Sequence, residues 1–249
     1  MMSSELTDLE KAEAAEKAAP VQVPVDVTAE RSREPGDAVA AAVAITPEMR
    51  VLEVGGTATA AAHVALTGAE VELTEGDAQP LPYDDDSFDR VLTVFGTMFA
   101  ADHDAAAGEL VRVCKPGGEI VMANWSPDGF AGRLSAVVRS HGAPDAQSAV
   151  APTEWGTHGH VRRRLGGQLV LAIEPAAVDL VAKSADALLA DLETSFPPLA
   201  AAASELEPQR LDELRAAVRA LIEELDAGEG ETRIASDYVV VIGHKPVAM

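Results

Sequence analysis

The sequence has one cysteine, few aromatic side chains and few cations. Cys114 alone excludes an internal disulfide and leaves no set of thiolates for a structural zinc ion. Only 19 basic side chains stand against 41 acidic ones, a formal charge of -22 at pH 7. The field of such a protein repels phosphate backbones, so nucleic acid is not an expected partner. An acidic surface also keeps an alanine-rich protein soluble, which alone can account for this composition.

Long apolar runs are missing as well. No stretch offers the roughly 18 uninterrupted apolar residues of a membrane span, and the N-terminus lacks a basic start followed by an apolar run. We therefore expect a cytoplasmic protein that does not bind membranes. The 249 residues, 47% of them hydrophobic, are enough to bury one substantial core.

The N-terminal residues are rich in Ala, Glu and Lys and poor in large apolar side chains. Such a composition buries too little surface to offset the entropy of ordering. We predict a flexible arm over residues 1–35 and one domain over residues 36–249. Pro35 and Gly36 mark the boundary, and Asp37 is expected to cap a short helix that ends near Ile45.

Strand-like and helix-like runs alternate after residue 50, a pattern typical of parallel strands joined by crossover helices. The expected fold is α/β, a doubly wound and mainly parallel sheet. It has a cofactor-binding half over residues 36–125, and a helical cap with C-terminal strands over residues 126–249. Cys114 is expected at the buried face of a helix. The predicted strands are 50–54, 70–74, 90–95, 119–123, 168–173 and 237–242. The predicted helices are 57–67, 102–114, 128–139, 153–165, 185–196 and 208–225.

The first predicted strand ends in a glycine turn. Residues 51–57 (VLEVGGT) form an apolar strand, two glycines and the start of a helix. Glycines let the backbone turn sharply and approach a ligand, and the following helix offers free N–H groups. The same pattern also occurs in purely structural turns of α/β proteins.

Four further segments follow this turn in order: residues 75–78 (EGDA), 81–83 (LPY), 86–89 (DSFD) and 110–118 (LVRVCKPGG). Together with the glycine turn, they resemble the class I S-adenosylmethionine-dependent methyltransferases, in particular the branch that modifies small molecules and quinones. The resemblance covers residues 51–134 and extends more faintly to residues 155–157. It implies a Rossmann-like methyltransferase fold, S-adenosylmethionine as the cofactor and a small-molecule acceptor.

The resemblance also implies where the methyl donor lies, across the carboxyl ends of the parallel strands. The amino-acid part of the donor would sit over the glycine turn, where Glu53 would orient it. Asp77 would accept a hydrogen bond from the adenine amino group, and residues 94–98 would form the floor under the sulfonium. Glu75 lies 20 positions after Gly55 (75 - 55 = 20), the spacing at which dinucleotide folds bind ribose. The implied cofactor-binding residues are Glu53, Gly55, Gly56, Thr57, Glu75, Asp77, Ala78 and Phe95.

Two features depart from the family pattern. Ala58 stands where a further glycine is common, and only 24 positions separate Glu53 from Asp77 (77 - 53 = 24). A parallel crossover needs a dozen or more residues, so the usual second and third strands, with a helix between them, cannot both fit. Either a strand and a helix are absent, or the strand at 70–74 serves for both. We expect a sheet at least one strand narrower than usual, with an open adenine side that a homodimer or the N-terminal arm could cover.

Methyl transfer from a sulfonium is an in-line displacement, so positioning in a dry pocket can supply much of the catalysis. A base is needed only if the acceptor must lose a proton. His103 is the first candidate and Tyr83 the second. The alternative for His103 is a helix-capping or surface role.

The remaining polar clusters favour ordinary surface roles. His158 and His160 have no third ligand at matching spacing, so a solvated turn is expected and no metal. Residues 162–164 are three consecutive arginines, expected on an exposed helix face.

The function expected from the sequence is S-adenosylmethionine-dependent methyl transfer to a small molecule. One alternative is a methyltransferase-like protein that has lost donor binding and serves as a binding or assembly subunit. Another is an enzyme that uses the same fold for a different reaction.

Overall fold

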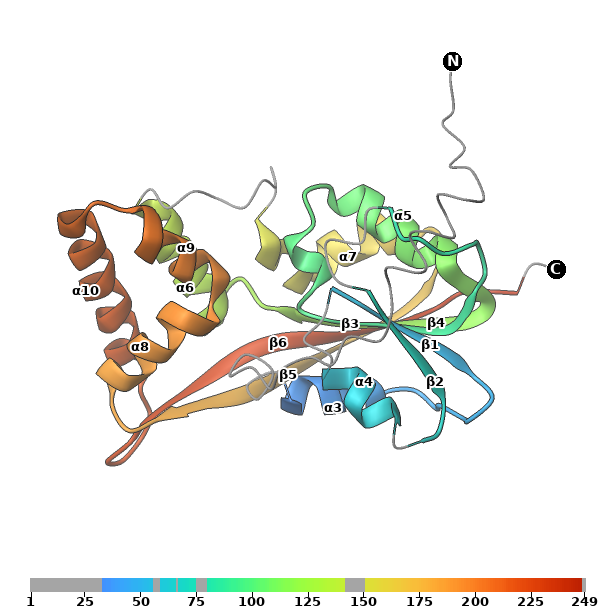
Figure 1. Ribbon diagram of the computed structural model, residues 1–249, viewed down its shortest axis with the longest axis horizontal. Coiled ribbons are helices and arrows are strands. Elements are labelled where there is room, and N and C mark those ends of the chain that lie inside the picture. Colours follow the sequence, from blue (N-terminus) through green and yellow to red (C-terminus); the bar gives the residue numbers. More distant parts are fainter. Residues whose placement is uncertain (1–32, 56–58, 66, 75–79, 142–150, 248–249) are drawn as a thin grey trace, which may run out of the picture.

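A six-stranded sheet forms the centre of the protein, with strand order β2-β1-β3-β4-β6-β5 (Figure 1). The computed structural model describes residues 33–55, 59–65, 67–74, 80–141 and 151–247. β1, β2, β3 and β4 run parallel, whereas β6 is antiparallel to both β4 and β5. The strands are β1 (Arg50–Val54), β2 (Glu70–Thr74), β3 (Phe88–Val94), β4 (Cys114–Trp125), β5 (Val170–Ala182) and β6 (Thr232–His244).

Helices cover both faces of this sheet, as the doubly wound prediction requires (Figure 1). One face carries α3 (Arg33–Ala41) and α4 (Thr59–Ala65). The other carries α5 (His103–Val113), α7 (His158–Leu165) and the 3-10 helix η2 (Pro152–Gly156). A short 3-10 helix, η1 (Thr97–Phe99), follows β3.

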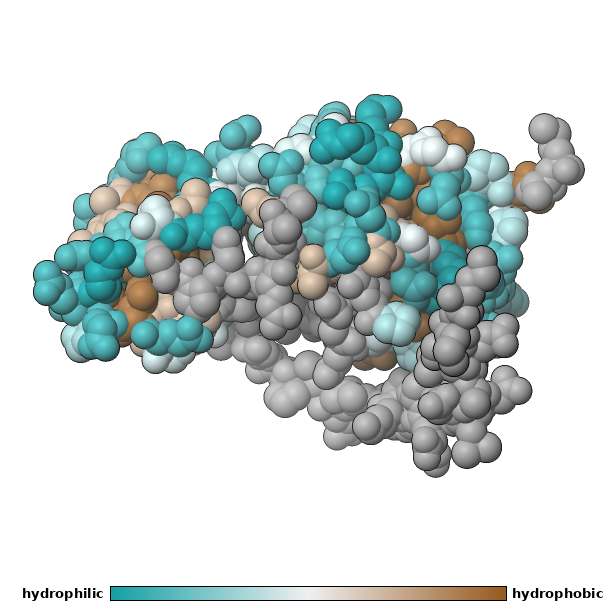
Figure 2. Space-filling model, turned by 90° about the horizontal axis from the view of Figure 1, so that it is seen from above, coloured by the Kyte–Doolittle hydropathy of each residue, from teal (hydrophilic) through white to brown (hydrophobic). Residues whose placement is uncertain are grey.

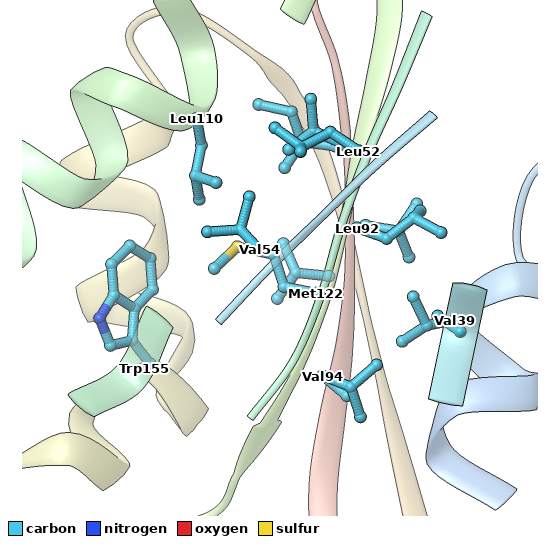
Figure 3. Close-up of a cluster of buried hydrophobic side chains, with 14 of the residues drawn as sticks. Val39, Leu52, Val54, Leu92, Val94, Leu110, Met122 and Trp155 are labelled. Carbon is cyan, nitrogen blue, oxygen red and sulfur yellow. The ribbon is translucent and has the colours of Figure 1, made fainter. Parts of the chain in front are cut away.

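The main hydrophobic core lies on both sides of the parallel strands (Figure 3). Leu52 and Val54 of β1 point towards Leu110 and Trp155, while Leu92 of β3 points to the opposite side. All five side chains are fully buried. Alternation along each strand thus serves two helical layers, which explains why the parallel strands are apolar nearly throughout.

A second hydrophobic core forms the helical cap. It joins α6 (Phe130–Ser140), α8 (Ala185–Ser195), α9 (Pro197–Glu205) and α10 (Pro208–Leu225) to the far ends of β5 and β6. Trp125, the last residue of β4, pairs with Tyr238, and β6 begins six residues earlier at Thr232 (238 - 232 = 6). The β5–β6 pair therefore carries the cap beyond the carboxyl ends of the parallel strands (Figure 1).

The sheet confirms the prediction of a narrow edge. Among the described residues between Thr67 and Asp84, β2 is the one strand, and it is the edge strand of the sheet. The chain passes from β2 to β3 without another crossover helix in the part that the structure describes.

Several predicted boundaries in the cofactor half differ from the structure; the strand predicted at 119–123, for example, is β4 over Cys114–Trp125. α3 begins at Arg33 and ends at Ala41, so Pro35 lies in the first helical turn, where its missing N–H costs nothing. The last residues of the predicted 1–35 arm are thus helical, while residues 1–32 lie outside the described part. Cys114 is the first residue of β4 rather than part of a helix, because α5 ends at Val113 and Cys114 has extended backbone angles.

The cap also differs from the sequence pattern. β5 and β6 each span 13 residues, about twice the predicted length. Pro175 interrupts the strand-like pattern of β5 in the sequence. An edge strand tolerates proline because one row of its backbone groups is unpaired. α9 was not predicted, although Pro197 and Pro198 begin it in the way that suits a first helical turn.

On the face shown in Figure 2, most of the described surface is polar, with brown apolar patches between the polar regions. Within the described residues, the exposed large hydrophobic side chains are Val170, Val181 and Val247. This distribution agrees with the acidic composition.

Candidate functional site

Glu53 is a buried carboxyl group near the carboxyl end of β1. Its side chain is 1% exposed, and its Oε2 accepts a hydrogen bond from the backbone N–H of Ala61 in α4 at 2.7 Å. Burial raises the pKa of Glu53 to about 7, against the opposing effect of hydrogen bonds from Ala61 and Ala60. Its Oε1 has no partner among the described residues. A buried carboxyl oxygen without a partner is costly unless a ligand or water completes it.

The turns after β1 and β3 touch each other. Gly55 has a φ of +62°, the left-handed region that favours glycine, and its N–H donates to the Thr74 carbonyl at 2.8 Å. A Cβ added to Gly96 would lie 2.1 Å from the Gly55 carbonyl oxygen. Only glycine fits at position 96. Sequence reasoning missed this role, although a glycine directly after a buried strand was a signal that could have found it.

Phe95 holds a strained position beside this contact. Its φ is +58°, which costs a non-glycine residue about 1 to 3 kcal/mol. The ring stacks on Trp125 with centroids 3.7 Å apart, and the ring of Tyr238 meets both edge-on. The Phe95 ring is therefore committed to an aromatic cluster, while its backbone leads into the Gly96 turn.

Asn124 is a further buried polar residue at this edge, and the sequence analysis did not single it out. It is 0% exposed, and neither its amide oxygen nor its amide nitrogen has a partner within the described residues. Its signal was a polar residue in the otherwise apolar run of β4. Neighbouring strands β1, β3 and β4 thus each bring an unusual group to their carboxyl ends.

Tyr83 lies farther out, beside the edge strand. Its hydroxyl shares a 2.7 Å hydrogen bond with Thr74 Oγ1, and its ring packs edge-on against Phe88. Burial raises the pKa of the Tyr83 phenol, which opposes the loss of its proton. These contacts give Tyr83 a structural role at the end of β2. They do not support the predicted role of Tyr83 as a base.

Arg112, within the 110–118 segment, fixes the chain around Tyr83. Its guanidinium donates to the carbonyls of Leu81 and Tyr83 and to the carboxylate of Asp85. Glu109 binds the same guanidinium and also accepts from the Leu81 N–H at 2.7 Å. The two side chains therefore clamp residues 81–85 onto α5. We refer to Arg112 and Glu109 as the clamp.

His103 is buried at the start of α5, and both of its ring nitrogens are used inside the protein. Nε2 lies 3.2 Å from the Met98 carbonyl, and Nδ1 lies 3.1 Å from His160 Nε2. A general base needs a free nitrogen that faces the acceptor, so the geometry gives His103 a structural role. His160 is also buried, contrary to the predicted solvated turn, whereas His158 is exposed on the same helix.

Arg164 departs from the predicted arginine surface. Arg162 and Arg163 are exposed, but the Arg164 side chain is only 13% exposed, and its guanidinium pairs with Asp104 at 3.1 Å. Burial of one arginine in three follows from the helical period, which turns position 164 inwards with His160.

Several predicted site residues lie outside the described part of the chain: Gly56, Thr57, Glu75, Asp77 and Ala78. Their roles towards the glycine turn, the ribose and the adenine stay predictions. Across the described ranges, no group of three or more His, Cys, Asp or Glu residues could hold a metal ion. No helix in that same part is both long and apolar enough to cross a membrane.

Comparison with known proteins agrees with this arrangement. Residues 28–122 match the methyltransferase domain family. An uncharacterized protein of Mycobacterium tuberculosis is 43% identical over 106 residues, which is 42% of this chain and 38% of that protein. A demethylmenaquinone methyltransferase of Streptomyces avermitilis is 38% identical over 109 residues, 35% of this chain and 47% of that enzyme. The chain thus spans less than half the length of these relatives.

The fold has a match among solved structures. A provisionally assigned methyltransferase from Bacillus halodurans superposes with a TM-score of 0.55 at 15% identity, over 86% of this chain and 100% of that one. At this identity, the likeness shows the shared fold. Residues 28–122 thus match a methyltransferase domain, and the chain shares its fold with this solved structure.

Proposed function

We propose that the protein transfers a methyl group from S-adenosylmethionine to a small-molecule acceptor. The observation that carries this proposal is that the buried Glu53 carboxyl group and the contact between Gly55 and Gly96 both lie at the carboxyl ends of β1 and β3. Open α/β sheets bind their ligands at that edge. The Glu53 carboxyl oxygen without a described partner, beside a glycine turn with a left-handed φ at Gly55, fits a ligand that carries an ammonium group.

The chain's own residues would bind and orient the donor rather than react with it. Glu53 would accept a hydrogen bond from the ammonium group, Gly55 would let the backbone come close to the donor, and Gly96 would let the second turn pack against the first. The donor, when bound, supplies an electrophilic methyl group on a sulfonium. Catalysis would come mainly from alignment of acceptor and methyl in a site that excludes water. The proposal requires no side-chain base.

For the acceptor, we propose a small molecule with a flat apolar part. Trp125 is partly exposed where β4 leaves the sheet for the cap, and Phe95 and Tyr238 support its ring. A stacked aromatic surface suits a planar ring. The Streptomyces avermitilis relative bears the name of an enzyme that methylates demethylmenaquinone, which supports the same class. A cytoplasmic location and a homodimer over the narrow sheet edge remain proposals from the sequence.

Isothermal titration with S-adenosylmethionine and S-adenosylhomocysteine tests donor binding. The wild type should bind both at one site per chain, and Glu53→Gln should weaken binding about tenfold or more, because a neutral amide loses its charged partner. Gly108→Ala is the matched control, since a Cβ at Gly108 meets nothing within 4 Å. A wild type that binds neither compound would refute the proposed function.

A further inference from the structure

We propose that His103 and His160 form a positioning pair that fixes η1, the turn within the floor of the donor site. The inference rests on the proposed function and names residues that would act on the donor only through the backbone of η1. The pair connects α5 and α7 to η1, and Arg164 extends the hydrogen-bonded contacts from His160 towards the protein surface.

The two imidazoles and Arg164 form a continuous chain of polar contacts. Arg164 Nη1 lies 3.3 Å from His160 Nδ1, His160 Nε2 lies 3.1 Å from His103 Nδ1, and His103 Nε2 lies 3.2 Å from the Met98 carbonyl. His103 is 2% exposed and His160 is 1% exposed. Trp155 of η2 packs against both rings.

The chemistry of the two ends determines the direction of every hydrogen bond. A carbonyl can only accept, so His103 Nε2 must carry the proton, and the Nδ1 of the neutral ring must accept. His160 then donates from Nε2 and accepts at Nδ1 from Arg164, which can only donate. Each link has one donor and one acceptor only while both rings are neutral. A proton added to either ring would set two donors against each other.

The electrostatic surroundings keep both rings neutral. Burial and the charge of Arg164 lower the pKa of His103, against the opposing effects of the hydrogen bond to the Met98 carbonyl and of the Asp104 and Asp102 charges. The same two causes lower the pKa of His160 to about 4. Arg163 acts in the same direction, while the Glu154 carboxylate stands 3.9 Å from His160 Nδ1. Both shifts favour the neutral rings that the chain of hydrogen bonds requires.

The hydrogen bond from His103 to the Met98 carbonyl matters because η1 directly follows the contact between Gly96 and Gly55. Gly96 touches Gly55 at one end of η1, and the Phe99 N–H donates to the Gly96 carbonyl. His103 holds the Met98 carbonyl in the middle of the same turn. An apolar pair of equal volume could fill this space, but it would leave the buried Met98 carbonyl without the imidazole donor. A directed hydrogen bond also sets the register of η1 against α5, which packing alone specifies less sharply.

Matched variants separate this role from bulk packing. His103→Leu removes both polar contacts, whereas the amide nitrogen of His103→Gln can still donate to the Met98 carbonyl. His158→Leu is the control, because His158 is exposed on the same helix as His160. The first readout is hydrogen exchange at the amides of Phe99 and Ala100, which close η1. We expect about tenfold faster exchange in His103→Leu and wild-type exchange in His103→Gln and His158→Leu.

Arg164→Leu keeps the claim testable if His103→Leu fails to fold, because Arg164 lies at the outer end of the chain. It should increase η1 exchange about twofold to threefold. The nitrogen NMR signals of both wild-type rings should show the neutral Nε2–H form between pH 6 and 8. Titration of either ring in that range, or Arg164→Leu with unchanged η1 exchange, would overturn the positioning pair.

The second readout is the dissociation constant of S-adenosylhomocysteine, which requires no acceptor. His103→Leu should bind about tenfold more weakly, and His103→Gln should recover to within about threefold of the wild type. Wild-type affinity in a folded His103→Leu variant would contradict the inference. If the wild type itself does not bind, the proposed function fails, while the exchange experiment still decides whether His103 fixes η1.

Discussion

At the scale of single residues, the site is built from groups that stability alone would not favour. Glu53 is a carboxyl group in a nearly dry position, Phe95 has a left-handed φ, and Asn124 is fully buried without a described partner. Each costs folding free energy, and all three lie at the carboxyl ends of neighbouring strands. Such costs concentrate at ligand sites, because the groups must be held ready for a ligand.

Glu53 should make the protein less stable as the pH rises. Its folded pKa, about 7, exceeds the ordinary value of 4.5. Folding therefore loses free energy as the pH rises from about 4.5 to 7, by a total on the order of 3 kcal/mol, and no further above that. In urea unfolding, Glu53→Gln should lose less stability than the wild type between pH 5 and pH 8. Parallel pH profiles for the two proteins would contradict a buried titrating Glu53.

Gly96 should not tolerate even one methyl group. Its backbone angles are ordinary, so the effect of Gly96→Ala comes from the clash with the Gly55 carbonyl at 2.1 Å. We expect a loss of about 1 to 3 kcal/mol or more in urea unfolding. Gly108→Ala should gain up to about 1 kcal/mol, because Gly108 is exposed within α5. Equal stability of the two variants would show that the turns do not touch.

At the scale of elements, the clamp holds the segment between β2 and β3 against α5. Arg112 and Glu109 attach residues 81–85 to α5 through backbone and side-chain groups. The sequence predicted a narrower sheet edge, since the 24 positions between Glu53 and Asp77 could not hold two strands with a helix between them. It could not show what holds residues 81–85 in place, because the contacts of Arg112 with Leu81 and Tyr83 span about thirty positions.

Arg112→Lys should loosen this segment. Lysine cannot reproduce the fork that reaches two carbonyls and two carboxylates, so we expect a loss of about 1 to 3 kcal/mol in unfolding free energy. Hydrogen exchange should rise at the Leu81 amide. Arg219→Lys is the control, because Arg219 is an exposed residue of α10 whose ion pairs should contribute little. Similar effects of both substitutions would mean that the clamp has no special role.

At the scale of the whole molecule, the parallel half was predictable and the cap was less so. The bounds of β1, β2 and α10 match the sequence prediction, because their apolar periodicity is strong and their ends are marked. β5 and β6 were found but cut short, since Pro175, Asp179 and Ser236 interrupt their apolar pattern. Partners distant in sequence, not local propensity, hold those strands together.

The candidate site likewise contains residues that the sequence could predict and residues that it could not. Glu53 and Gly55 could be identified because strand and turn lie next to each other in the sequence. The positioning pair could not be identified, because His103 and His160 are 57 positions apart and meet only through the packing of α7 on α5. His103 therefore looked like a free base, and His160 looked like part of a turn.

The central claim is that S-adenosylmethionine binds at the carboxyl ends of β1 and β3. The most direct measurement is an amide NMR titration of the wild type with S-adenosylhomocysteine. We predict saturable shifts for the amides of Gly55, Phe95 and Gly96, with little change in α8 and α10 of the cap. No saturable shift at these three amides, or shifts confined to the cap, would contradict the account.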